Sequence, residues 1–114
     1  MSRDQYVRAL LALYGGLPHT AARRRPSPQD RRLAEQLFER QIPLDTITTA
    51  CHLAIARRAL RRPDAYPLAP IRSLAYFLPV LDEILLNPPE PAYIAYLRAR
   101  LDQQVQFSTV LEDR

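Results

Sequence analysis

Hydrophobic residues recur every three to four positions along most of this chain, which is the period of an amphipathic α-helix. The spacing predicts helices over residues 2–14, 28–40, 43–62 and 71–86, and one more from residue 91 to about 107. Eleven prolines punctuate the segments, and the presence of only two glycines argues against tight β-hairpins. The pattern therefore predicts an all-α fold without a β-strand longer than three residues. The expected architecture is a single compact domain of five helices over residues 1–114, with residues 108–114 frayed.

The segment over residues 43–62 is predicted to form the central helix. Its apolar residues cover most of the helix circumference, a pattern typical of a helix packed on several sides. Asp45 in the first turn and basic residues in the last turns both suit the helix dipole. Four arginines make up this basic end: Arg57, Arg58, Arg61 and Arg62. The helix is therefore expected to be the most buried one and to reach the surface at its arginines.

Two features shape the helices on either side of the central one. Residues 40–43 form a very short turn before it, which predicts an angled pair of helices of the helix-turn-helix type. Pro79 lies inside the fourth helix, where a proline removes one backbone hydrogen bond. A kink or a break is therefore expected between Phe77 and Pro79.

The composition is that of an ordinary globular protein, with 47% hydrophobic and 25% charged residues among 114. Cys51 is the only cysteine and falls on the apolar face of the central helix, so we expect a packed core thiol and no intrachain disulfide. The first residues lack an apolar signal core, and no apolar run approaches the length of a membrane span. The predicted location is therefore the cytoplasm.

Charge is distributed unevenly along the chain. All sixteen basic residues are arginines, and the formal net charge is +4. Residues 1–72 hold thirteen arginines and six acidic residues, which gives +7, whereas residues 73–114 hold three and six, which gives −3. This asymmetry predicts a basic face and a neutral to acidic remainder.

The sequence contains no pattern for catalysis, for a metal or for a cofactor. Cys51 and His52 are adjacent, so a helix directs their side chains about 100° apart, and the only other histidine is His19. Asp82 and Glu83 are also neighbours and do not converge on one substrate. Two glycines cannot build a glycine-rich phosphate loop. We therefore expect no catalytic residue, no metal site and no cofactor, and a protein that is not an enzyme.

The arginines instead favour binding to nucleic acid. Seven of them are the candidate phosphate-binding residues: Arg23, Arg24, Arg25, Arg57, Arg58, Arg61 and Arg62. Thr46, Thr48, Thr49 and His52 occupy the start of the central helix, where base-reading side chains would lie, but Asp45 would face phosphate there. Phosphate contacts are therefore expected rather than sequence readout.

Other interpretations of the same residues stay open. Residues 23–25 also suit a charged connector, and the arginines of the central helix also suit a basic helix end. The alternative function is a protein–protein adaptor. Its partner would be acidic, or it would be a second copy that binds apolar surface on the fourth and fifth helices.

A resemblance supports the DNA interpretation. It is carried by R-Q-I-P-L-D at residues 40–45, A-R-R-A-L-R-R at 56–62 and I-R-S-L-A-Y-F-L-P-V-L-D-E-I-L at 71–85. The order of these segments, over about half the chain, resembles the small helical modules of DnaD-type primosome proteins and of phage and plasmid replication proteins. The aromatic segment of that family is represented here by Tyr76 and Phe77. The resemblance implies a non-enzymatic, DNA-associated or helicase-loading role with a replication protein as a possible partner.

Overall fold

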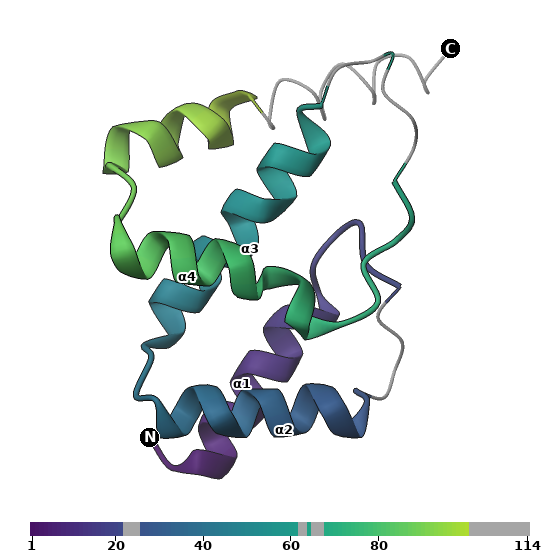
Figure 1. Cartoon of the computed structure of the whole chain (residues 1–114), viewed down its shortest axis with the longest axis vertical. Coiled ribbons are helices and arrows are strands. Elements are labelled where there is room, and N and C mark those ends of the chain that lie inside the picture. The colour runs from purple at the N-terminus through teal and green to yellow at the C-terminus, as the bar shows by residue number, and fades with distance from the viewer. Residues whose placement is uncertain (22–25, 62–63, 65–67, 101–114) are drawn as a thin grey trace.

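The computed structural model describes residues 1–21, 26–61, 64 and 68–100. Its named elements are α1 (Arg3–Gly15), α2 (Pro28–Glu39), α3 (Leu44–Ala59), the 3₁₀-helix η1 (Leu74–Phe77) and α4 (Leu78–Leu86) (Figure 1). A fifth α-helix covers residues 91–100, up to the last described residue. Within the described ranges the only β-type pairing is an isolated bridge between Thr20 and Ile71. The prediction of an all-α, five-helix fold is confirmed.

Helix α1 begins at a capping box. The Ser2 hydroxyl accepts the Gln5 N–H at 3.2 Å, and the Gln5 side chain accepts the Ser2 N–H at 2.9 Å. The helix packs mainly on α2, with Tyr6, Val7 and Leu10 buried between them and the rest of the core. The predicted start of α1 is thus confirmed. It could be predicted because a capping box involves only residues three positions apart.

Helix α2 begins and ends at equally local signals. The Ser27 hydroxyl accepts the Asp30 N–H at 3.0 Å, and Pro28 occupies the first turn. At the other end Gln41 adopts a left-handed conformation with φ of 59°. Its N–H donates to the Phe38 carbonyl at 2.9 Å, and the Ile42 N–H donates to the Leu37 carbonyl at 3.2 Å. These two bonds form a Schellman motif, which turns the chain into α3 within a few residues.

Helix α3 is the most buried of the named α-helices, as predicted. Seven of its sixteen residues are buried, namely Ile47, Ala50, Cys51, Leu53, Ala54, Ile55 and Ala56. Cys51 is a core thiol with 0% exposure, as predicted, and burial raises its pKa to about 12. The predicted end was wrong, however, because α3 stops at Ala59 and not at Arg62. Pro63 disfavours helical geometry at the residue before it, which accounts for an earlier end.

The fourth predicted helix is divided in two. The 3₁₀-helix η1 ends at Phe77 and α4 begins at Leu78 with Pro79 in its first turn, so the predicted break is confirmed. The predicted start at Ile71 was wrong. The Ile71 N–H donates to the His19 carbonyl at 2.8 Å and its carbonyl accepts the Ala21 N–H at 2.7 Å, so its backbone serves the bridge instead of a helix.

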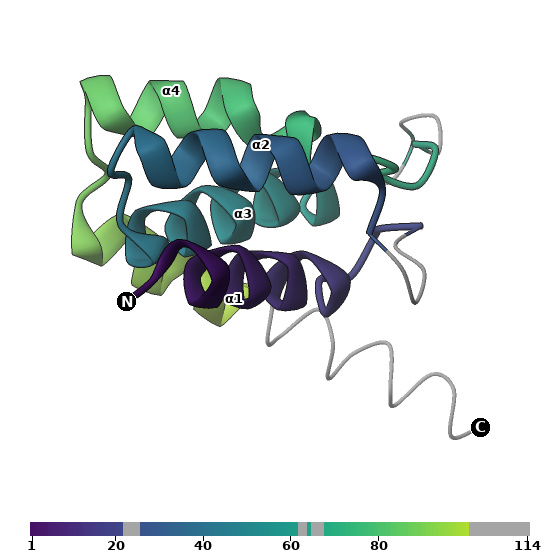
Figure 2. The same ribbon diagram turned by 90° about the horizontal axis from the view of Figure 1, so that it is seen from below.

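The helices pack as two pairs, α1 with α2 and α3 with α4, and η1 contacts both α2 and α3. Figure 2 shows α3 in the middle of the molecule, between α1 on one side and α4 on the other. Helices α2 and α3 are joined by the predicted short turn but make little direct contact, because the apolar side of α2 packs against α1 and η1. The fifth helix begins at residue 91 as predicted and buries Leu97 against the core.

Candidate nucleic-acid interface

Arg57, at the end of α3, is engaged by a carboxylate of α4. Its Nη1 donates to Glu83 Oε2 at 2.8 Å and its Nη2 to Glu83 Oε1 at 2.6 Å. This two-pronged contact raises the pKa of Arg57 and lowers that of Glu83. The Arg57 side chain is still 42% exposed. A phosphate would therefore have to compete with Glu83 for the guanidinium group.

Arg58 holds the chain that follows α3. Its Nη2 donates to the Ala69 carbonyl, and its guanidinium carbon lies 5.8 Å from the centre of the Tyr76 ring. Nη1 also reaches the Tyr76 hydroxyl at 3.5 Å. These contacts tie α3 to η1 and to the segment before it, so part of the donor capacity of Arg58 serves the fold.

The structure says less about the other five predicted site residues. Arg61 lies beyond the end of α3, is exposed, and interacts with another part of the protein. Arg62, Arg23, Arg24 and Arg25 lie outside the described residues. Because α3 ends at Ala59, Arg61 lies outside the helix that carries Arg57, although the predicted range of 43–62 had included both.

A second group of arginines comes from α2 and from the segment before η1. Arg31, Arg32 and Arg72 are exposed, and none of them forms an ion pair with a described residue. The spacing of Arg31 and Glu35 suits an i,i+4 pair, but Glu35 instead accepts a hydrogen bond from Arg3 of α1 at 3.0 Å. We call Arg31, Arg32 and Arg72 the α2 arginine group.

One buried hydrogen bond joins the start of α2 to η1. Asp30 is buried, with 4% exposure, and its Oδ1 accepts the Leu74 N–H at 3.0 Å. This bond fixes the start of α2 beside η1. Arg31 directly follows Asp30 in the chain, and Arg72 precedes Leu74 by two positions. Both views show the first turn of α2 beside the segment that leads into η1 (Figures 1 and 2).

The described residues on both sides of the predicted arginine triplet are anchored near the α2 arginine group. Ala21, bonded to Ile71, and Ser27, the cap of α2, are described residues on the two sides of residues 23–25. Ala21 and Ser27 therefore both lie near the α2 arginine group. From the sequence, Arg31, Arg32 and Arg72 contributed only to the charge count, because the pairing of Glu35 with Arg3 of α1 depends on the tertiary structure.

Two threonines at the start of α3 donate hydrogen bonds within their own helix. The Thr48 hydroxyl donates to the Leu44 carbonyl at 2.8 Å, and the Thr49 hydroxyl donates to the Asp45 carbonyl at 3.0 Å. Each hydroxyl thus bonds its own helix four residues back. Their O–H donors are therefore occupied, and the expectation that bases are not read here stays a prediction.

No family model matches the chain, and no curated protein or solved structure matches it significantly. The resemblance to DnaD-type modules therefore stays a prediction. Across the described ranges, no helix combines the length and the apolar character that crossing a bilayer requires.

Proposed function

We propose that this protein binds nucleic acid, with duplex DNA as the expected partner, through phosphate contacts made by arginines. The observation that carries the proposal is the α2 arginine group, three exposed guanidinium groups without a carboxylate partner among the described residues. Arginine presents several donors in a fork that suits phosphate oxygens. Arg23, Arg24 and Arg25 belong to the proposal because their chain neighbours are anchored beside this group.

The basic end of α3 has a smaller part in this proposal than the sequence had suggested. Arg57 and Arg58 already hold Glu83, Ala69 and Tyr76, so replacing them would disturb the fold as well as any phosphate contact. Arg61 and Arg62 remain candidates for additional contacts. A place in replication, which the resemblance implies, is part of the same proposal.

The test is a titration with duplex and single-stranded DNA at several salt concentrations. The variant replaces Arg31, Arg32 and Arg72 with alanine. Its matched control replaces Arg3, Arg8 and Arg40, which lie 3.0, 3.1 and 3.9 Å from their carboxylates, so the net charge changes equally. We expect the first variant to lose about tenfold or more in affinity, and its salt slope on duplex DNA to shrink by about 0.9 per lost contact.

The loss should be similar for every DNA sequence, because phosphate contacts carry no direct sequence information. Equal losses in the two triple variants would show that overall charge, and not this group, determines binding. Unchanged binding in both would reject the proposal and favour an adaptor that binds an acidic protein. Circular dichroism establishes that both variants are folded.

A further inference from the structure

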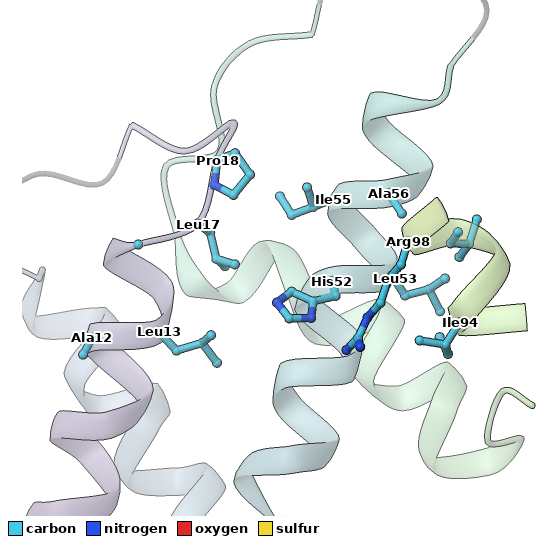
Figure 3. A pocket seen from close by; sticks show the side chains of 12 residues that line it. Ala12, Leu13, Leu17, Pro18, His52, Leu53, Ile55, Ala56, Ile94 and Arg98 are labelled. Atoms are coloured by element: carbon cyan, nitrogen blue, oxygen red, sulfur yellow. The ribbon is translucent and has the colours of Figure 1, made fainter. Parts of the chain in front are cut away.

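A groove lies between α1, α3 and the helix over residues 91–100, on different elements from the α2 arginine group (Figure 3). Its volume is about 570 Å³, within the range of small-molecule sites. The groove exists because α1 packs on α2 and α3 packs on α4, which leaves α1 and α3 with few contacts to each other. Ala12 of α1 and Ala56 of α3 face this space with short side chains.

The walls of the groove are apolar. Leu13 comes from α1, Leu53 and Ile55 from α3, and Ile94 and Leu97 from the helix over residues 91–100. A hydrocarbon chain that lies against these side chains is removed from water, which is the dominant favourable contribution to binding by apolar ligands. The lining therefore favours a ligand with an extended apolar part.

Two nitrogen-bearing side chains, His52 and Arg98, are the polar side chains of the lining. Figure 3 shows the His52 ring and the Arg98 guanidinium group near each other at the groove. Arg98 forms no ion pair with another described residue. Burial and the charge of Arg98 both lower the pKa of His52, which keeps its imidazole neutral near pH 7. The groove thus combines apolar walls with one positive charge that no described residue pairs with.

We propose that this groove binds an amphipathic organic carboxylate of the fatty-acid class. The acyl chain lies along the leucine and isoleucine walls, and the carboxylate accepts hydrogen bonds from the Arg98 guanidinium group. A carboxylate matches the fork of arginine donors and supplies the charge that the described part of the site lacks. The neutral His52 ring can donate one further hydrogen bond to the same head group.

The experiment uses the full chain and dodecanoate below its micelle concentration, with binding measured by isothermal titration calorimetry. Dodecanol and dodecyltrimethylammonium share the tail and differ in the head group. We expect dodecanoate to bind with one molecule per chain and the two others to bind about tenfold or more weakly. Equal binding of the three would overturn the proposal, because the positive charge would then have no part.

Variants locate the site. Arg98→Ala should weaken dodecanoate binding by about 10- to 100-fold, as expected for the loss of a hydrogen bond to a charged group, and Arg98→Lys should retain part of it. Arg100→Ala is the matched control, because Arg100 contacts Tyr96 and does not line the groove. Ala12→Phe should fill the groove from an exposed position and abolish binding.

Three outcomes would reject this assignment. They are absence of dodecanoate binding to the parent, equal effects of Arg98→Ala and Arg100→Ala, and unchanged binding in a folded Ala12→Phe variant. A parent that is dimeric, with Ala12→Phe monomeric, would instead assign the groove to contact between two copies. Arg98→Ala should leave DNA binding unchanged, so this inference and the proposed function fail separately.

Discussion

At the scale of single residues, two buried tyrosines differ in how their hydroxyl groups are satisfied. Tyr6 donates to the Ile42 carbonyl at 2.7 Å and so joins α1 to the turn before α3. The hydroxyl of Tyr14 is buried without a hydrogen-bond partner among the described residues. Burial raises its pKa, and the nearby charge of Asp30 raises it further. The hydroxyl group therefore stabilises the fold at Tyr6 and opposes it at Tyr14, whose ring is still part of the core.

This difference predicts opposite effects of removing each hydroxyl. Tyr6→Phe should lower the free energy of unfolding by about 1–3 kcal/mol, because it leaves the Ile42 carbonyl without its donor. Tyr14→Phe should leave it unchanged or raise it, because it removes an unpaired polar group. Urea unfolding of both variants measures the two effects. A larger loss at Tyr14 than at Tyr6 would contradict this interpretation.

At the scale of elements, the turn between α2 and α3 depends on a strained residue. Gln41 has φ of 59°, a left-handed conformation that costs a residue with a side chain about 1–2 kcal/mol. The Schellman bonds of Gln41 and Ile42 keep it there, because they satisfy carbonyls at the end of α2.

Glycine at this position should therefore stabilise the protein. Gln41→Gly removes the strain but costs about 0.4–1 kcal/mol through the larger entropy of the unfolded chain, so the net gain should lie between zero and about 1.5 kcal/mol. Gln36→Gly, at an exposed position inside α2, is the control and should cost about 1 kcal/mol. Denaturation midpoints compare the two variants. Destabilisation of similar size at both positions would show that the turn carries no strain.

At the scale of the whole molecule, charges that are separated along the chain meet in space. Two acidic residues of α4 neutralise arginines from the basic part of the chain, with Asp82 3.9 Å from Arg40 and Glu83 2.6 Å from Arg57. The division of charge between +7 and −3 that the sequence shows is therefore partly cancelled across the helix pairs. Among the described residues of the basic part of the chain, Arg31, Arg32 and Arg72 are exposed arginines that keep no carboxylate partner.

The lowered pKa values of His52 and Glu83 predict that the protein loses stability in acid. Burial and Arg98 lower the pKa of folded His52 below its ordinary 6.5, so its contribution is complete above pH 6.5 and falls as pH decreases through the folded pKa. Arg57 lowers the pKa of Glu83 below 4.5, so that contribution is lost at still lower pH. Thermal unfolding from pH 8 to pH 3 measures both. His52→Gln should flatten the curve between pH 7 and 5, and an unchanged curve would show that His52 has an ordinary pKa.

Features that depend on neighbouring residues could be predicted from the sequence. Ser2 and Ser27 start their helices, Pro79 divides the fourth one, and the continuous apolar surface of residues 44–59 makes α3 the most buried. Each of these depends on hydrogen bonds or periodicity within a few positions, which the order of residues determines directly.

The candidate site depended instead on contacts between distant residues. Glu35 has Arg31 one helical turn away but bonds Arg3 of another helix, and Arg57 finds its carboxylate 26 positions further along the chain. Ile71 leaves its predicted helix because His19 and Ala21 offer its backbone other partners. Spacing along a helix cannot specify such pairs, since they form only when packing brings the elements together. The sequence therefore determined the helices and their buried faces, while the tertiary structure decided which arginines are left without a carboxylate.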